Sequence, residues 1–320
     1  MKRVTIRYWI RCLVLMFLII GLITACSHHT VKNTVSPTNL ASKDCRVVQH
    51  TMGETCVPIN PQRIVTFSLP TLGNAIALGV KPLGSTYVDM LDEHTYLKSK
   101  VKGINSLGIS SPNLEKILLI KPDIIIGWNA ERQFYPLLSQ IAPTVLFNWQ
   151  NKTWRDLFDF VTQVLGKEEA AQQAWEHYHQ RVEKLKAALG DRYKNKEISL
   201  VFLAPGVIFS ETKNSFPDFI LQDVGLQRPQ AQNAIAPSAQ LYFSLEELEK
   251  ADGDVMFVGT LTDDSQNFLE ELKQKPLWKH LRAVQQNHVY PINYLTWRGG
   301  NLLAADAVID DLYKYLVNTQ

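Results

Sequence analysis

The 320-residue sequence predicts two α/β lobes joined by one long α-helix. Segments typical of a strand and of a helix alternate along the chain, and the order seen in residues 63–147 recurs in residues 198–258. A strongly helical stretch lies between the two halves. With 46% hydrophobic and 20% charged residues, the composition is that of a globular chain with a sizeable core.

The first 43 residues have the pattern of an export signal followed by a tether. Residues 2–11 are basic and residues 12–23 are apolar, a run too short for an ordinary membrane span. Residues 23–26 (ITAC) resemble a bacterial lipobox, so residues 1–25 are predicted to be a lipoprotein signal peptide and Cys26 the lipidated residue. Residues 26–43 are polar, as a flexible membrane tether should be. An uncleaved anchor, or ordinary secretion with an incidental cysteine, is the alternative.

The formal charge of +2 comes from this leader. Lys2, Arg3, Arg7 and Arg11 precede residue 25, where there is no acidic residue, and without them 29 basic groups face 31 acidic ones. The mature chain would therefore be slightly acidic. That balance does not suggest the usual basic surface of a nucleic-acid reader, so no nucleic-acid partner is predicted.

Residues 45–56 are predicted to form two short strands around a turn at Gly53. Cys45 and Cys56 lie in this stretch, and in an oxidising compartment they are expected to form a disulfide that stabilises it by about 2–3 kcal/mol. A metal or redox site is the alternative, although the chain has no C-x-x-C motif.

The remaining elements follow from hydrophobic periodicity and from breakers. The first half is predicted to contain strands at 63–67, 124–126 and 142–147 and helices at 71–78 and 113–120. The second half is predicted to contain strands at 198–203 and 255–258 and helices at 217–223 and 245–250. In the first half, 51 residues separate Ile64 from Glu115 at the start of the helix at 113–120. In the second half, 48 residues separate Ile198 from Glu246 at the start of the helix at 245–250.

Residues 154–189 are predicted to be helical, with a break at Gly166. The piece at 168–189 would span about 33 Å, the length of a domain, and would make a stiff hinge that disfavours large opening motions. The predicted division is a lobe at 44–152, the linking helix at 153–190 and a second lobe at 191–320. Because such sheets bind ligands at the carboxyl ends of their strands, a ligand cleft is expected between the lobes.

Several short segments, weak singly but specific in their order, carry a family resemblance: residues 50–53 (HTMG), 61–65 (PQRIV), 77–82 (ALGVKP), 113–118 (NLEKIL), 121–125 (KPDII), 215–216 (SF), 224–226 (VGL), 244–248 (SLEEL) and 297–300 (WRGG). Over residues 45–318 the chain resembles the iron-siderophore substrate-binding proteins of ABC importers, the class III or cobalamin/siderophore type. The sequence of the Cys45–Cys56 hairpin resembles that of the cyanobacterial branch of this family.

The resemblance implies two Rossmann-like lobes and a monomer that captures a ferric siderophore or ferric citrate-type chelate and delivers it to an ABC permease dimer. Iron would be held only through the chelator, so neither a cofactor nor a protein metal ligand is expected. Glu131 and Glu246 fall at positions where the family docks on permease arginines. Two separated acidic groups would fix orientation as well as attraction. The alternative for each is a solvated glutamate in the first turn of a helix.

A bulky, often anionic chelate calls for aromatic walls and a few Arg or Tyr donors. Lys213 and Ser215 stand where hydroxamate binders have Trp and Arg, whereas Trp297 matches one of their ligand-facing tryptophans. Aromatic residues near strand ends often belong to the core, and Arg132 could simply pair with an acid. The predicted contacts are Ser68, Trp128, Arg132, Trp149, Phe209, Lys213, Ser215, Tyr242, Tyr294, Trp297 and Arg298.

Three other classes compete with this interpretation. The chain lacks the G-x-S-x-G, G-x-G-x-x-G, P-loop and H-E-x-x-H motifs, so it is not expected to be an enzyme. A direct Zn or Mn binder would need clustered ligands, and His94, His280 and His288 are scattered. Haem or cobalamin remains an alternative cargo for the same fold. The sequence does not choose among citrate, citrate-hydroxamate, trihydroxamate and catecholate chelates.

Overall fold

The computed structural model describes residues 45–91, 95–109, 111–235 and 240–318. The predicted signal peptide (1–25) and tether (26–43), including Cys26, lie outside these residues. Within the described ranges, no helix has both the length and the apolar character that crossing a membrane requires.

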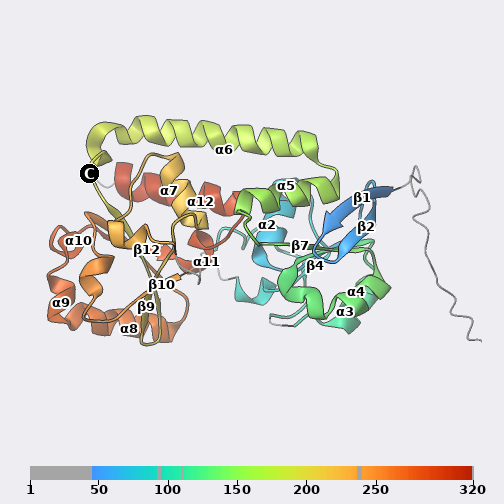
Figure 1. The fold of residues 1–320 in the computed structure, drawn as a ribbon, viewed down its shortest axis with the longest axis horizontal. Coiled ribbons are helices and arrows are strands. Elements are labelled where there is room, and N and C mark those ends of the chain that lie inside the picture. The colour runs from blue at the N-terminus through green and yellow to red at the C-terminus, as the bar shows by residue number, and fades with distance from the viewer. Residues whose placement is uncertain (1–44, 92–94, 110, 236–239, 319–320) are drawn as a thin grey trace, which may run out of the picture. The chain divides into compact units, whose positions relative to one another are not determined.

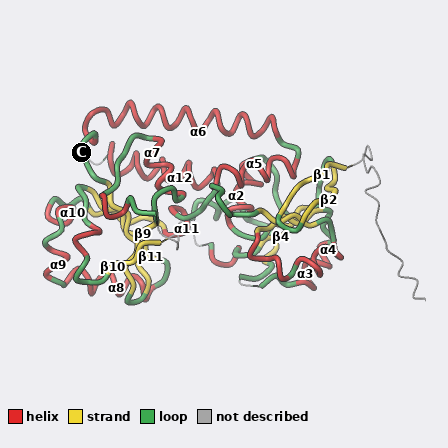
Figure 2. The backbone as a smooth tube through the Cα atoms, in the orientation of Figure 1, coloured by secondary structure: helices red, strands yellow, loops and turns green. Residues whose placement is uncertain are grey.

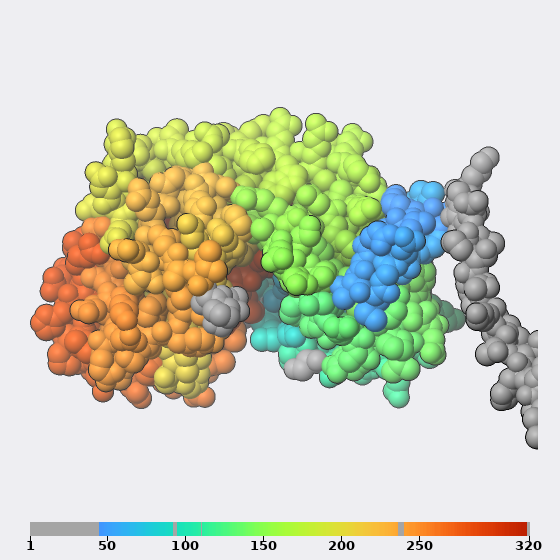
Figure 3. Space-filling model, viewed as in Figure 1, coloured from blue at the N-terminus to red at the C-terminus, as the bar shows by residue number. Residues whose placement is uncertain are grey.

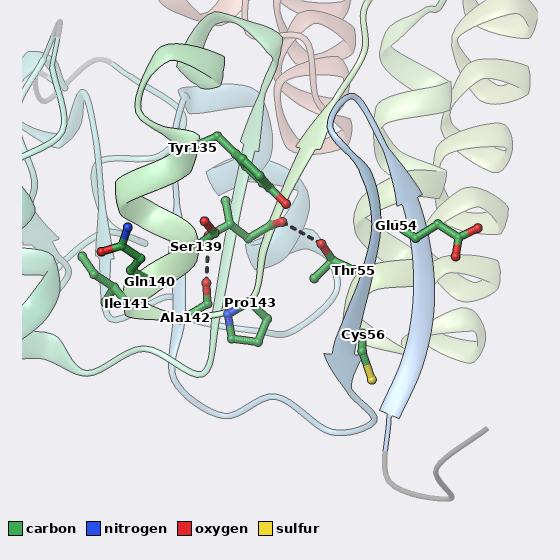
Figure 4. Close-up of a pocket in the computed structure, with 10 residues that line it drawn as sticks. Glu54, Thr55, Cys56, Tyr135, Ser139, Gln140, Ile141, Ala142 and Pro143 are labelled. Atoms are coloured by element: carbon green, nitrogen blue, oxygen red, sulfur yellow. Dashed lines mark hydrogen bonds between the residues drawn. The ribbon is translucent and has the colours of Figure 1, made fainter. Parts of the chain in front are cut away.

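The chain begins with an antiparallel hairpin of β1 (Cys45–His50) and β2 (Gly53–Pro58). The turn requires Gly53 in a left-handed conformation, with φ of +117°. The structure confirms the predicted disulfide between Cys45 and Cys56, whose Cα atoms are 5.6 Å apart. The hairpin lies against β7 (Thr144–Phe147), where the Thr55 hydroxyl donates a hydrogen bond of 3.3 Å to the carbonyl of Thr144 (Figure 4).

The first lobe is built on a parallel five-stranded sheet in the order β5-β4-β3-β6-β7. Its helices are α2, α3 and α4, and its strands at 64–66, 124–128 and 144–147 are almost entirely buried, as parallel strands covered on both faces are. The bounds are β3 (Ile64–Thr66), α2 (Leu69–Ala77), β4 (Gly84–Ser85), β5 (Asn105–Ser106), α3 (Leu114–Ile120), β6 (Ile124–Trp128) and α4 (Tyr135–Ile141).

The second lobe has a mixed sheet in the order β10-β9-β8-β11-β12, in which β8, β11 and β12 are parallel and β9 and β10 are antiparallel additions. The strands are β8 (Ile198–Ala204), β9 (Val207–Glu211), β10 (Gln240–Phe243), β11 (Val255–Thr260) and β12 (Val289–Asn293). Its helices are α7 (Phe216–Asp223), α8 (Asp263–Gln274), α9 (Pro276–Lys279), α10 (Arg282–Gln285), α11 (Tyr294–Trp297) and α12 (Leu302–Leu312).

One predicted helix of the second lobe is much shorter than expected. Instead of a helix at 245–250, the structure has only the 3₁₀ turn η5 (Leu248–Ala251). The Glu247 carboxylate accepts a hydrogen bond from the backbone N–H of Ser244 (3.3 Å), the N–H groups of Glu247 and Leu248 bond to carbonyls three residues back, and Asp252 and Gly253 follow at once. Too few residues therefore remain for successive α-helical turns.

Each lobe has an aspartate at the same place in its sheet, with the same kind of hydrogen bond. Asp123, just before β6, accepts hydrogen bonds from the backbone N–H groups of Gln62 (2.7 Å) and Arg63 (3.0 Å). Asp254, just before β11, accepts one from the backbone N–H of Glu197 (2.8 Å). In each lobe this carboxylate fastens the start of one parallel strand to the start of its neighbour, which supports the predicted repeat.

Between the lobes the chain forms α5 (Trp154–Leu165) and α6 (Glu168–Leu189), broken at the predicted Gly166 with φ of +64°. A Cβ at Gly166 would lie 2.4 Å from a guanidinium nitrogen at the flexible end of Arg46, so the positive φ, rather than packing, is what favours glycine here. Figure 1 shows α6 passing elements of both lobes, and it packs on α5 and α12 through a buried stripe that includes Tyr178 and Val182.

The linking helix is not the only joint, because α12 of the second lobe packs on α2 of the first (Figure 2). The backbone N–H of Leu302 donates to the Asn74 side chain (3.2 Å), and the Asn301 amide donates to the Tyr96 hydroxyl. Asn74 and Asn301 are both fully buried. This second joint adds to the stiffness that the sequence predicted from the helix alone.

Candidate functional site

A cavity of about 700 Å³ is lined by residues of both lobes and of α5. The surface in Figure 3 is hollowed between the part coloured blue to green and the part coloured yellow to orange. In the first lobe the lining residues end β6 or follow β3, β4 and β7, at the carboxyl ends of parallel strands. In the second lobe they come from the end of β9, the start of α7 and the loops after β11 and β12.

The first-lobe wall is aromatic, and its charged lining residue is the exposed Lys152 at its edge. Trp128 ends β6 and Trp149 follows β7, and their rings meet edge to face with centroids 6.4 Å apart. Trp149 also meets Phe147 at 5.1 Å, so its ring is supported from below. Ser68 has the strained φ of +101°, and its hydroxyl caps α2 by accepting from the N–H of Thr71 (3.3 Å). The main role of the Ser68 hydroxyl is therefore to cap α2, although Ser68 also lines the cavity.

The second-lobe wall carries an ion pair. The Arg298 Nε lies 2.5 Å from the Glu211 carboxylate, and its Nη1 donates to the Tyr294 hydroxyl. The guanidinium also lies over the rings of Tyr294 (4.9 Å) and Phe209 (5.5 Å). Glu211 is only 6% exposed. Burial raises the pKa of the Glu211 carboxyl above its ordinary value, and the charge of Arg298 opposes that rise.

A second arginine supports this wall from behind. Arg228 is 4% exposed and lies 3.4 Å from the Asp218 carboxylate. It also donates to the hydroxyl of Ser210 and to the carbonyls of Glu211 (2.7 Å) and Thr212 (3.3 Å). Burial lowers the pKa of Arg228, and Asp218 counters that effect. Arg228 thus fixes the backbone from which Glu211 projects.

The buried polar atoms of the lining that have no hydrogen-bond partner among the described residues include the indole Nε1 of Trp154 and the hydroxyl of Ser215. Trp154 is 2% exposed and opens α5, where the Thr153 side chain caps the helix. A buried donor normally finds a partner, so these groups suit oxygen atoms of a bound molecule.

The structure brings six of the eleven predicted contacts to the cavity: Ser68, Trp128, Trp149, Ser215, Tyr294 and Arg298. Five others do not line it. Trp297 has no exposed surface, meets Phe257 at 4.8 Å and donates its indole N–H to Asp311 (2.7 Å), so it is part of the core. The remaining four are Arg132, Phe209, Lys213 and Tyr242.

Each of these four has a physical reason for its place. Phe209 is a buried strand residue that meets Phe202 at 5.7 Å and lies behind Arg298. Tyr242 is 58% exposed on the edge strand β10. Arg132 and Lys213 are exposed.

Sequence reasoning missed several lining residues, above all Glu211 and Trp154. Trp154 was within the predicted linking helix, and its position directly after the loop that follows β7 was the available signal. Glu211 gave no local signal, because it reaches the cavity only through the antiparallel strand β9, which the sequence pattern did not reveal.

The two predicted docking glutamates differ in environment. Glu246 is exposed. Glu131 is half-buried and its carboxylate accepts a hydrogen bond of 2.9 Å from the backbone N–H of Trp128. Burial raises the pKa of Glu131 to about 7, so at neutral pH it is only partly ionised. Glu115, the repeat counterpart of Glu246, is exposed in the first turn of α3.

A smaller cavity of about 510 Å³ lies between the hairpin and α4 (Figure 4). It is lined by one lobe only, with Ser139, Gln140 and Pro143 among its residues, and Glu54 is its charged member. Its aromatic lining residue is Tyr135, and no cation is among the described residues that line it. In the part of the chain that the structure describes, no group of three or more His, Cys, Asp or Glu side chains is placed to hold a metal ion.

Two α/β lobes on a linking helix, with a cavity lined from both, define the class of solute-binding proteins that enclose a ligand between lobes. The chain belongs to the periplasmic binding protein family, whose pattern matches residues 72–294.

Three relatives align over most of the chain. The "Probable siderophore-binding lipoprotein YfiY" of Bacillus subtilis is 31% identical over 89% of this chain and 92% of its own. The Fe(3+)-citrate-binding protein YfmC of the same organism is 30% identical over 87% and 88%. The achromobactin-binding periplasmic protein of Dickeya dadantii is 29% identical over 79% and 86%.

Solved structures agree with the fold. Staphylococcus aureus SirA complexed with staphyloferrin B is 26% identical, has a TM-score of 0.73 and aligns over 85% of this chain and 98% of its own. The triscatecholate-binding protein FeuA of Bacillus subtilis, complexed with ferri-bacillibactin, has a TM-score of 0.72 at 23% identity over 85% and 98%, a likeness of fold.

Proposed function

We propose that the protein captures a ferric siderophore or ferric citrate-type chelate outside the cytoplasmic membrane and delivers it to an ABC importer. One observation carries the proposal: a cavity between two lobes combines the aromatic walls of Trp128 and Trp149 with the guanidinium of Arg298. Its volume suits a bulky small molecule, and arginine suits the carboxylate oxygens of such chelates. The relatives named for siderophores and ferric citrate support this cargo.

The direct test is a fluorescence titration of the purified protein. Three tryptophans line the cavity, so a ferric chelate that enters it should quench intrinsic emission. The panel should contain ferric citrate, a citrate-hydroxamate, a trihydroxamate and a tris-catecholate, with haem, cobalamin, Zn²⁺ and Mn²⁺ beside them. Submicromolar binding of haem or Zn²⁺ with no response to any ferric chelate would overturn the proposal.

Docking to the permease would use two separated acidic groups. The exposed Glu246 suits this role. In the first lobe, Glu115 suits it better than Glu131, since Glu115 is the exposed counterpart of Glu246 in the repeat whereas the carboxylate of Glu131 is bonded within its own turn. Chelate uptake by cells that carry Glu115→Gln, Glu131→Gln or Glu246→Gln tests this assignment. Uptake lost only with Glu131→Gln would reverse it.

Membrane attachment would be through lipid on Cys26 after removal of residues 1–25. Mass spectrometry of the membrane fraction should find diacylglyceryl on a peptide that begins at Cys26. A mature protein that starts elsewhere, or a soluble form without lipid, would contradict this assignment. The division into lobes at 44–152 and 191–320 with the helix at 153–190 is proposed with it.

A further inference from the structure

The charged groups of the cavity nearly cancel. Of the described residues that line it, the cations are Lys152 and Arg298 and the carboxylate is Glu211. Lys152 is exposed and lies 3.5 Å from Asp156, so solvent and that carboxylate weaken its field. Arg298 is paired with the buried Glu211 at 2.5 Å. A ligand therefore meets an arginine whose charge is already largely balanced.

We propose that Glu211 sets the charge of the accepted chelate, so that the cavity takes an uncharged or monoanionic ferric complex in preference to a trianionic one. This inference rests on the proposed function and narrows its ligand class. A citrate-dihydroxamate chelate, whose iron-bound carboxylate leaves one oxygen for Arg298, has the required chemistry, and a tris-catecholate does not.

The geometry shows why Glu211 matters beyond orienting Arg298. Its carboxylate holds Nε, and the Tyr294 hydroxyl holds Nη1. As far as the described residues show, this leaves the other N–H groups of Nη1 and Nη2 for a ligand carboxylate. A neutral acceptor could orient Nε of Arg298 equally well. The negative charge of Glu211 is therefore not needed for orientation and has a separate effect on the ligand. That charge lies in the cavity wall and offsets the attraction of Arg298 for each negative charge of a ligand.

The size of the effect follows from electrostatics. Replacing Glu211 by a neutral residue leaves the charge of Arg298 unbalanced, and at an effective dielectric constant of about 20 a unit charge roughly 8 Å from a ligand charge changes Kd by about tenfold or more for each unit of ligand charge. Arg228 lies behind Glu211, but its own partner Asp218 at 3.4 Å balances it. The preference should therefore grow with the negative charge of the chelate.

The experiment measures Kd for three ferric chelates: an uncharged trihydroxamate, a monoanionic citrate-dihydroxamate and a trianionic tris-catecholate. Wild type should bind the first two more tightly than the third, because a cavity whose charges nearly cancel does not offset the desolvation of three negative charges. Glu211→Gln should reduce that ratio at least about tenfold. Glu211→Asp, which keeps the charge, should preserve it, as should Glu249→Gln, which removes the same charge from an exposed site on η5. Circular dichroism and thermal unfolding check the fold of each variant.

Two results would overturn the inference and leave the proposed function standing. One is wild-type protein that binds the tris-catecholate as tightly as the uncharged chelate, which needs no variant at all. The other is Glu211→Gln that weakens all three chelates by the same factor, the mark of a purely structural residue. If wild type binds no ferric chelate, the proposed function fails and this inference falls with it.

Discussion

The two walls of the cavity solve different parts of one binding problem. The first-lobe wall offers the apolar faces and edges of Trp128 and Trp149, and Phe147 meets Trp149 edge to face. The second-lobe wall offers a charged group, Arg298, whose orientation depends on Glu211 and on the buried Arg228 behind it. An aromatic wall tolerates many shapes of ligand, whereas an arginine held in one orientation discriminates among oxygen groups. The comparison suggests that shape is accepted on one side and charge is selected on the other.

The largest effect should follow from removing the support of the charged wall. Arg228→Met leaves Asp218 buried without its cation and should lower the free energy of unfolding by about 3–5 kcal/mol. Urea unfolding followed by circular dichroism measures this loss. As a control, Lys186→Met breaks the exposed pair of Lys186 with Glu183 and should cost less than about 1 kcal/mol. Equal losses in the two variants would show that Arg228 does not support the wall.

Next comes the charged group itself. Arg298→Ala should weaken a carboxylate-bearing ferric chelate about 10- to 100-fold, because hydrogen bonds to charged groups contribute about 1.5–3 kcal/mol. Arg298→Lys keeps the positive charge but loses the paired N–H donors of the guanidinium. Its affinity for the chelate should therefore fall between that of wild type and that of Arg298→Ala. Arg132→Ala removes an exposed arginine outside the cavity and should leave Kd within about twofold. Isothermal titration calorimetry measures Kd for the three variants. Unchanged affinity in Arg298→Ala would show that the charged wall does not contribute to binding.

The contrast between Arg298 and Trp297 shows what the sequence could and could not predict. Both lie in the loop and short helix after β12, and local pattern made them equally good candidates. Which neighbour faces the cavity depends on packing against Phe257 and on the Asp311 acceptor, residues 40 and 14 positions away. Elements with strong periodicity, such as α6 with its break at Gly166, were predicted closely because local chemistry defines them. The antiparallel pair β9 and β10, and with it Glu211, depends on long-range pairing that no local signal marks.

The aromatic wall should show a smaller and less selective effect. Trp149→Ala removes the edge-to-face partner of Trp128 and should weaken every ferric chelate by about five- to tenfold, irrespective of its charge. Trp149→Phe keeps an aromatic face and should recover most of the loss. Titrations with an uncharged and an anionic chelate separate the two walls. A loss confined to the anionic chelate would mean that Trp149 acts through Arg298 and that the walls are not independent.

The smallest effect concerns the hairpin that holds β7 beneath Trp149. The His50 Nδ1 accepts from the backbone N–H groups of Met52 and Leu146, each at 3.3 Å, and its Nε2 lies 2.8 Å from the Thr55 hydroxyl. A protonated Nδ1 cannot accept, and burial lowers the pKa of His50 below 6.5.

Because the unfolded chain binds the His50 proton more readily than the folded chain, this contribution to stability is complete above about pH 6.5 and is lost as the pH falls through the lowered pKa. Wild type should therefore lose more stability on acidification than His50→Gln, which carries no such proton. Urea midpoints of the two proteins at neutral and mildly acidic pH measure the difference. Parallel curves would show that His50 does not couple protonation to the hairpin, and would leave the contact of the hairpin with β7 to the hydrogen bonds of Thr51 and Thr55.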